Sequence, residues 1–412
     1  MIALDRRRGQ SHWMRFPGGA QSKESGVGAC NGIRVVEMGA MVTAPLAAQI
    51  LADLGAEVIK VEPLEGEVMR SIPPVHNGVS AAFAQWNRNK KSVTLNLKTP
   101  AGAEAARKLV NSADVLITNY RPKVMKAFQL DYQPVARTNP GLVYAALSGF
   151  GPTGPYSDQP AYDMVMQALT GFMPVQGGKG SPAAVKATVV DKITGYSAAL
   201  SILAALLHRA GGGGGQLIDV SMMDAYAAFM LPETLYSTTF LDAPPSKPWT
   251  ADLYNTVKLK EGCALGYIMT DGQFKNACEA FGLQHLMADA RFADPGVRNL
   301  HMPEMMKEIE AVTQHMTRED FLTVIRKHEV PFSPVNDLED FQRDPQAIHN
   351  ETFVEFVDER VGRVSLLNSF ARFAKTPVNA KALPPEKGAH NEEVFHGLGL
   401  GAAEIDALKA PA

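Results

Sequence analysis

Short apolar runs and longer amphipathic segments follow one another in a regular order along the first half of the chain. The short runs are typical of buried strands and occupy residues 32–38, 57–62, 92–97, 114–118, 142–147 and 217–221. Segments with helical spacing of apolar residues occupy 43–54, 99–111, 192–208 and 222–230. Strands that alternate with helices over about 190 residues predict an open, doubly wound, Rossmann-like α/β domain with a parallel sheet.

One of these junctions holds a lone carboxylate. Residues 187–190 predict a short strand, Asp191 follows it, and a helix then runs to His208 before the glycines of 211–215 end it. Five apolar residues share one helix face, which we expect to be buried: Ile193, Tyr196, Leu200, Leu203 and Leu207. Asp191 is either an N-cap or a reactive group, and the local pattern alone favours the cap.

The remaining sequence predicts further parts around this large domain. We expect a disordered N-terminal extension over residues 1–29, and the first part of the large domain over 30–230. Residues 231–256 contain four prolines and little periodicity, which indicates a linker. A smaller α/β domain is expected at 257–335. Residues 336–412 are then expected to return to the large domain and form a tail.

Composition excludes several classes of function. The 412 residues carry a net charge of −3, which gives no electrostatic argument for a nucleic-acid or membrane-surface partner. The three cysteines have no disulfide or zinc spacing, which suits a reducing cytoplasm. No run of about 18 apolar residues is free of charges and breakers, so we expect no membrane span.

The chain lacks the common cofactor and nucleophile motifs. It has no phosphate-binding G-x-x-x-x-G-K-[ST] loop, no dinucleotide fingerprint after a predicted strand, no G-x-S-x-G elbow and no histidine cluster. We therefore expect no metal and no permanently bound cofactor. Ligands of such sheets bind beyond the carboxyl ends of the strands. The polar candidates at or beyond these ends are Lys98, Asn119, Arg121, Tyr162 and Asp163.

A series of short motifs, in a fixed order, resembles the class III CoA-transferases, the group that contains formyl-CoA transferase, carnitine CoA-transferase and α-methylacyl-CoA racemase. The motifs extend from the first predicted strand almost to the C-terminus. They read LADLGAEVIKVEP at 51–63, NKKS at 89–92, NYRP at 119–122, SGFG at 148–151, PAYD at 160–163, DVSMMDA at 219–225 and HNEEV at 390–394.

The resemblance implies a function for the lone carboxylate and for the strand ends. It implies that Asp191 is the nucleophile that takes an acyl group from an acyl-CoA and then carries CoA as a thioester. It also implies a homodimer of interlocked chains, with acyl-CoA and a carboxylic acid as substrates. The residues that match CoA contacts are Val42, Thr43, Leu95, Lys98, Asn119, Tyr120, Arg121, Tyr162 and Asp163.

Two other functions remain open at this point. Racemases of the same group have a histidine at the position of Tyr162, and a tyrosine lacks a suitable pKa for proton transfer near neutrality. A non-catalytic acyl-CoA-binding protein is the third possibility. The chain also departs from formyl-CoA transferase at Pro63 and Ala127, where the resemblance would place basic residues. Which acids exchange CoA is not encoded in these motifs.

Overall fold

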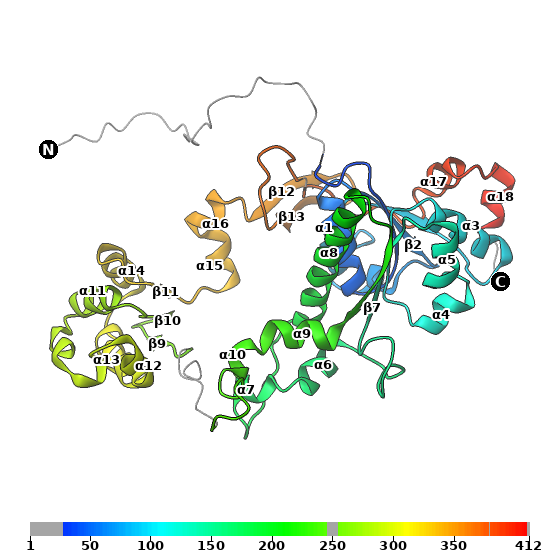
Figure 1. The fold of residues 1–412 in the computed structure, drawn as a ribbon. Coiled ribbons are helices and arrows are strands. Elements are labelled where there is room, and N and C mark those ends of the chain that lie inside the picture. Colours follow the sequence, from blue (N-terminus) through cyan, green and yellow to red (C-terminus); the bar gives the residue numbers. More distant parts are fainter. Residues whose placement is uncertain (1–27, 245–253, 379, 410–412) are drawn as a thin grey trace.

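We describe the protein from a computed structural model, which covers residues 28–244, 254–378 and 380–409. The predicted extension over 1–29 therefore lies almost wholly outside the described residues, as does part of the predicted linker. A six-stranded sheet forms the centre of the large domain (Figure 1). Its strands are β1 (Arg34–Met38), β2 (Glu57–Glu62), β5 (Lys90–Thr94), β6 (Val115–Thr118), β7 (Val143–Ser148) and β8 (Gln216–Ser221).

All neighbouring strands of this sheet run parallel, in the spatial order β5-β2-β1-β6-β7-β8. Numbered by their sequence within the sheet, the strands follow the order 3-2-1-4-5-6 of a doubly wound fold, which confirms the predicted class. The strand predicted at 92–97 begins and ends earlier, because a turn starts at Asn96, whose backbone oxygen accepts the Thr99 N–H.

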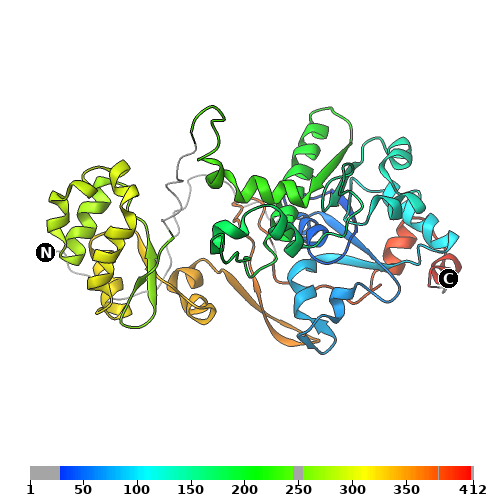
Figure 2. The same ribbon diagram turned by 90° about the horizontal axis from the view of Figure 1, so that it is seen from below.

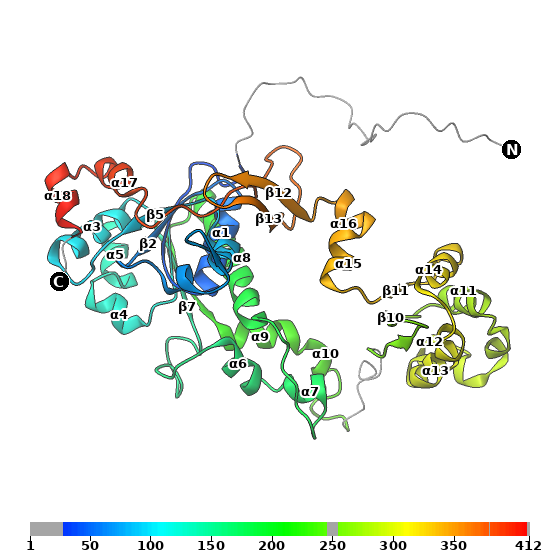
Figure 3. The same cartoon turned by 180° about the vertical axis from the view of Figure 1, so that it is seen from behind.

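Helices cover both faces of the sheet, and each face has its own apolar core (Figures 1 and 3). Helices α1 (Thr43–Asp53) and α8 (Val189–Ala210) pack together on one face. The other face is covered by α3 (Pro100–Asn111), α5 (Tyr132–Thr138) and the C-terminal helices α17 (Asn391–Gly397) and α18 (Ala402–Ala407). The remaining elements of this part are α2 (Ala81–Asn87), α4 (Pro122–Ala127), α6 (Asp163–Leu169), α7 (Met173–Gly177), α9 (Met222–Met230), α10 (Pro232–Leu235), the 3-10 helix η1 (Val68–Ser71), and the strands β3 (Val75–His76) and β4 (Val79–Ser80).

Helix α8 differs from its prediction in three respects. No strand precedes it, because residues 187 and 188 lie in an irregular segment and the helix already starts at Val189. Asp191 is therefore in its first turn rather than at its N-cap. The face expected to be buried is largely exposed, with Leu200 at 71% and Leu207 at 75%, because small residues such as Ala198 and Ala205 face the sheet instead.

By length and composition alone, α8 could cross a membrane, contrary to the expectation from the sequence. Core helices of soluble proteins pass the same test. Here α8 packs against α1, β7 and β8 as one layer of the α/β domain.

A second, smaller body follows α10 in the chain and stands beside the large domain (Figure 2). Its sheet has the order β11-β10-β9 and is antiparallel. Around a core of its own it contains β9 (Val257–Lys258), β10 (Cys263–Gly266), β11 (Phe332–Pro334), the helices α11 (Asp271–Phe281), α12 (Pro295–Leu300), α13 (Met302–Thr313) and α14 (Arg318–Lys327), and the 3-10 helices η3 (Gln284–Ala288) and η4 (Ala290–Phe292).

The chain then returns to the large domain through α15 (Leu338–Arg343), α16 (Pro345–His349) and a hairpin of β12 (Phe353–Asp358) and β13 (Gly362–Leu367). Residues 388–391 complete the return by covering β5, the edge strand of the large sheet. The His390 N–H bonds to the Ser92 oxygen over 3.0 Å, and the Thr94 N–H donates to Asn391 Oδ1 over 2.8 Å. The edge therefore has partners for its backbone groups.

We expect Asn391→Ala to lower the free energy of unfolding by about 1–3 kcal/mol, because it leaves the buried Thr94 N–H without an acceptor. Urea unfolding followed by circular dichroism measures the loss. Glu392→Ala, at the neighbouring exposed position, is the control. Equal stability of the two variants would contradict this account of the sheet edge.

Candidate active site

Two loops meet at the point where the strand order of the large sheet reverses. One follows β1 and contains residues 39–42, and the other follows β6 and contains Asn119. Asn119 joins them: its Oδ1 accepts the Ala40 N–H over 3.0 Å, and its Nδ2 donates to the Ala40 oxygen over 2.8 Å and to Thr43 Oγ1 over 3.0 Å. Such a switch point is where doubly wound sheets bind their ligands.

The predicted contacts Val42 and Thr43 form the start of α1 at this edge, and both residues are buried. No side chain caps this helix start, so it presents backbone N–H groups and the positive end of the helix dipole. Gly39 allows the tight approach, since a Cβ there would lie 2.6 Å from Ala44 Cβ and 2.9 Å from Asn119 Oδ1.

The start of α8 is capped from another helix. Asp163, the first residue of α6, is buried, and its Oδ2 accepts the N–H groups of Val190 over 2.7 Å and of Asp191 over 3.2 Å. Gln167 holds the other oxygen of Asp163 over 2.6 Å, and it also accepts the Val185 N–H over 2.9 Å. The backbone around Asp191 is thus fixed by a carboxylate and an amide one helical turn apart.

Burial and one neighbouring carboxylate change the protonation of Asp191. Burial, and then the charge of Asp163, raise the pKa of Asp191 to about 7. Burial outweighs the dipole, and the group is poised between its two forms.

A close contact between α1 and α8 brings Asp191 toward the first loop. A Cβ on Gly195 would lie only 3.0 Å from Leu46 Cδ2, so glycine permits the two helices to approach here. Both helices return from the carboxyl edge of the parallel sheet and run in the same direction. Asp191 precedes Gly195 by four residues, as Val42 precedes Leu46, so both lie about one turn, ~5.4 Å, beyond the contact. Asp191 and the start of α1 therefore share one edge.

Three further predicted residues line one pocket of 380 Å³ at the ends of β1, β2 and β5. These are Leu95, Lys98 and Tyr120. The other lining residues are mostly apolar, and the pocket includes Met38, Val61, Glu62, Pro63, Leu64, Glu65, Asn96, Leu97 and Phe128. A pocket of this size with an exposed lysine at its rim can hold a flat ring and an adjoining phosphate.

Two predicted residues, Arg121 and Tyr162, neither line this pocket nor take part in the contacts described above. Arg121 is exposed at the N-cap of α4, and Tyr162 is 67% exposed at the N-cap of α6. The sequence reasoning also missed the role of Gln167. Its spacing of four residues from Asp163 on one helix was the available signal.

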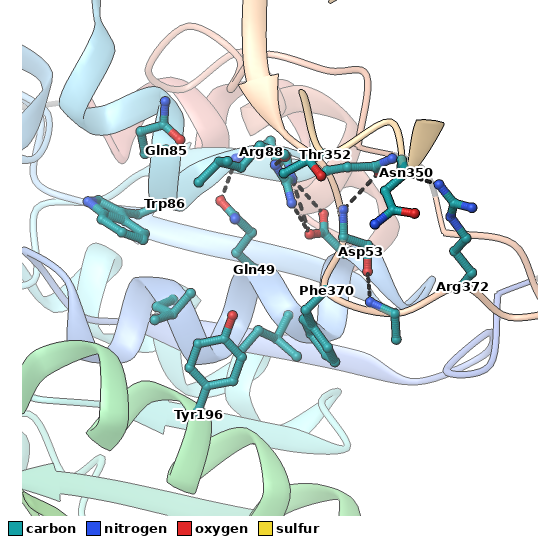
Figure 4. Close-up of a pocket in the computed structure, with 16 residues that line it drawn as sticks. Gln49, Asp53, Gln85, Trp86, Arg88, Tyr196, Asn350, Thr352, Phe370 and Arg372 are labelled. Carbon is teal, nitrogen blue, oxygen red and sulfur yellow. Dashed lines mark hydrogen bonds and ion pairs between the residues drawn. The ribbon is translucent and has the colours of Figure 1, made fainter. Parts of the chain in front are cut away.

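Another pocket, of 580 Å³, lies elsewhere, between α1, α2, α8 and the segment after β13 (Figure 4). Arg88 and Asp53 form an ion pair of 2.6 Å in its wall, beside Tyr196 and Phe370. None of the residues predicted to act on or bind CoA lines it. Within residues 28–244, 254–378 and 380–409, no group of three or more histidine, cysteine or acidic side chains has a metal-binding arrangement.

Comparison with known proteins identifies the family. The sequence pattern of CoA-transferase family III matches residues 30–391. The chain belongs to CoA-transferase family III. It is thus an enzyme of this class, which acts on CoA thioesters, and the resemblance seen in the sequence motifs is confirmed.

The named relatives are CoA-transferases, and this chain matches them over nearly their whole length. The chain is 32% identical to a succinate–glutarate CoA-transferase of Agrobacterium fabrum, with 89% of this chain and 95% of the relative covered. It is 30% identical to a formyl-CoA:oxalate CoA-transferase of Streptomyces avermitilis, with 93% and 98% covered. Among solved structures, a CAIB/BAIF family protein from Brucella suis superposes with a TM-score of 0.78 at 29% identity, with 90% and 100% covered.

The raised pKa of Asp191 predicts a pH-dependent stability. The carboxyl of Asp191 has a pKa near 7 in the folded state and 3.8 in the unfolded state. It therefore lowers the free energy of unfolding progressively as the pH rises from about 4 to 7. Asp191→Asn should therefore stabilise the protein at pH 8 by about 1–2 kcal/mol after allowance for solvent screening, and have little effect at pH 4. Urea unfolding at both pH values tests this. A stabilisation that is the same at both would contradict the assigned pKa.

Proposed function

We propose that this enzyme moves CoA from an acyl-CoA donor to a carboxylic acid acceptor, and that the carboxylate of Asp191 carries the acyl group and then CoA. The single observation that supports Asp191 is its position: a carboxylate in the first turn of α8, at the sheet edge where α1 also starts. Covalent catalysis by a carboxylate divides one difficult transfer into feasible steps.

The first half-reaction forms two bonds to Asp191 in turn. Its ionised carboxylate attacks the thioester carbonyl, the C–S bond breaks, and CoA leaves as a thiolate. The resulting mixed anhydride is attacked at the aspartyl carbonyl by the thiolate, which releases the donor acid and leaves an aspartyl-CoA thioester. The acceptor carboxylate then repeats these steps in reverse order, and Asp191 is regenerated.

The oxyanion of each tetrahedral intermediate requires hydrogen-bond donors. The uncapped N–H groups at the start of α1 are suitable in kind and lie at the same edge as Asp191. In this proposal Asp163 is a positioning residue, because its oxygens are taken by Val190, Asp191 and Gln167. The resemblance instead suggested that Asp163 contacts CoA.

CoA lies across the carboxyl edge of the sheet in this proposal. The pocket formed by Leu95, Lys98 and Tyr120 takes the nucleotide end, and Val42 and Thr43 adjoin the thioester end. Lys98 and Arg121 are exposed cations suited to phosphates. Relatives named for succinate, glutarate and citramalate make short dicarboxylic acids the first substrates to test.

No observation favours the racemase, which needs a second acid–base group opposite Asp191. Tyr162, at the relevant position, is an exposed tyrosine. The cytoplasmic location expected from the cysteines remains part of the proposal.

A homodimer also belongs to the proposal. The α8 face with Tyr196, Leu200 and Leu207 is apolar and largely exposed in the single chain, and the Phe370 ring packs against only part of it. Exposed apolar surface of this kind marks an interface between proteins. The interlocked arrangement itself rests on the family resemblance.

Asp191→Asn should abolish CoA exchange, with a loss of at least about 10³-fold, because an amide cannot form the anhydride. Asp224→Asn is a matched control, since Asp224 occupies the same third position of the neighbouring helix α9. Exchange is assayed with succinyl-CoA and formyl-CoA against a panel of carboxylic acids. An aspartyl-CoA thioester trapped by hydroxylamine at Asp191 would support the proposal, and full activity of Asp191→Asn would refute it.

The activity should depend on pH through Asp191. Because only the ionised carboxylate attacks, kcat/KM for the acyl-CoA should rise about tenfold per pH unit below 7 and level off above it. A profile measured from pH 5 to pH 9 checks this. A profile that is already level at pH 5 would show that burial does not raise the pKa of Asp191 in the working enzyme.

The dimer is tested with Leu200→Arg, which places a charge on the exposed face of α8. We expect sedimentation velocity to show a dimer for the unmodified protein and a larger share of monomer for this variant. Leu300→Arg, an equally exposed leucine of the smaller body, is the control and should remain dimeric. A monomeric unmodified protein would rule the dimer out.

A further inference from the structure

A buried group of charges lies beneath the loop between β1 and α1, and it takes no part in the chemistry proposed above. Its centre is Lys60, on β2, whose side chain is only 2% exposed. Lys60 Nζ lies 2.7 Å from Glu37 Oε1, 2.5 Å from Glu67 Oε2 and 3.0 Å from the Gly39 oxygen. Glu37 and Gly39 accept hydrogen bonds from this ammonium group, and Glu67 is its ion-pair partner.

Glu67 reaches the same loop from the other side. Its Oε1 accepts the Met41 N–H over 2.7 Å, and its own N–H donates to Glu62 Oε2 over 3.0 Å. Its side chain is 3% exposed. Glu67 lies in the turn after β2, so the hydrogen bond connects a rigid neighbouring strand with the tip of the loop.

Met41 needs such support. It has φ +67°, the left-handed conformation that a residue with a Cβ rarely adopts. Conformations of this kind persist only where the surroundings enforce them, and they gather at functional sites. The loop is thus held by three side chains: Lys60 at Gly39, Asn119 at Ala40 and Glu67 at Met41.

The charges themselves suggest a purpose other than stability. Buried ion pairs contribute little net stability, because desolvation of both ions offsets their attraction. Burial alone would lower the pKa of Lys60, but the carboxylates of Glu37 and Glu67 raise the pKa above its ordinary value, so the ammonium stays charged. What this group does achieve is a fixed position for the backbone of residues 39–41.

We infer that Glu67 and Lys60 are positioning residues for CoA binding, which fix the left-handed loop at Met41 so that the start of α1 faces the thioester. This rests on the proposed function, since it takes the start of α1 as part of the CoA site. Neither residue touches substrate. Their effect is on the affinity for CoA and, because the start of α1 also supplies the proposed oxyanion donors, on the chemical step.

The test compares Glu67→Ala, Glu67→Gln and Asp53→Asn. Alanine removes both the acceptor for Met41 and the partner of Lys60, whereas glutamine keeps an acceptor for Met41. Asp53→Asn weakens a different buried ion pair, with Arg88, at the far end of α1 and is the matched control. We expect the Kd for CoA, measured by calorimetry, to rise about tenfold for alanine and about threefold for glutamine, and to be unchanged for Asp53→Asn.

Two further measurements separate positioning from general damage. The KM for the acyl-CoA should rise with the Kd, and kcat at saturation should fall in Glu67→Ala while it stays unchanged in Asp53→Asn. Amide hydrogen exchange of residues 39–43 in the free protein should accelerate in Glu67→Ala and stay unchanged in Asp53→Asn.

Unchanged amide hydrogen exchange of residues 39–43 in a folded Glu67→Ala variant would overturn the inference. An equal loss of CoA affinity in Asp53→Asn would also overturn it. The exchange measurement needs no ligand, so it stands apart from the proposed function. Failure of the unmodified protein to bind CoA would refute the proposed function and also the assignment of this loop to CoA. Faster amide hydrogen exchange in Glu67→Ala would then show only that Glu67 stabilises this loop of the fold.

Discussion

The site depends on one capping interaction, in which Asp163 accepts hydrogen bonds from N–H groups in the first turn of α8. A long connection that contains the short helices α6 and α7 separates β7 from α8, and the N-cap residue of α8, Thr188, makes no side-chain capping bond. Asp163 fixes the start of the helix through hydrogen bonds of 2.7 and 3.2 Å to the N–H groups of Val190 and Asp191. Gln167 in turn holds both Asp163 and the backbone at Val185. The helix therefore starts with Asp191 in its first turn, facing the edge where α1 starts.

That capping has an electrostatic consequence. A neutral cap such as serine would satisfy the same N–H groups without a second negative charge near Asp191. The carboxylate of Asp163 adds to the effect of burial and raises the pKa of its neighbour. A nucleophile with a pKa near neutrality is more basic than an ordinary aspartate, and it is still ionised in a large fraction of molecules. Under the proposed function, the pair makes Asp191 more reactive at the expense of stability, a trade that is common at functional sites.

The sheet could be predicted from the sequence because its parallel strands are buried on both faces and appear as continuous apolar runs. The site could be predicted only in part. Motif order predicts Asp191 as the nucleophile, but the protonation of this residue depends on Asp163, which is 28 residues away and connected to it through tertiary structure. The exposed face of α8 was missed because Leu200 and Leu207 share the apolar pattern of a core, whereas alanines make the actual contact with the sheet. Periodicity shows that a face is apolar but does not identify what covers it.

Three polar contacts between distant segments hold the two parts of the site, which are the first loop and the start of α8. Asn119 holds the first loop from β6, Glu67 holds it from the turn after β2, and Asp163 holds α8 from α6. Apolar packing could bring these elements together but could not fix the direction of their N–H groups, because it is not directional. Acyl transfer needs donors in place before charge develops on the carbonyl oxygen, since reorganisation during the reaction would consume the gain. Buried carboxylates and amides are costly to place in a fold. Their concentration at this one edge therefore indicates that the orientation of its N–H groups is important.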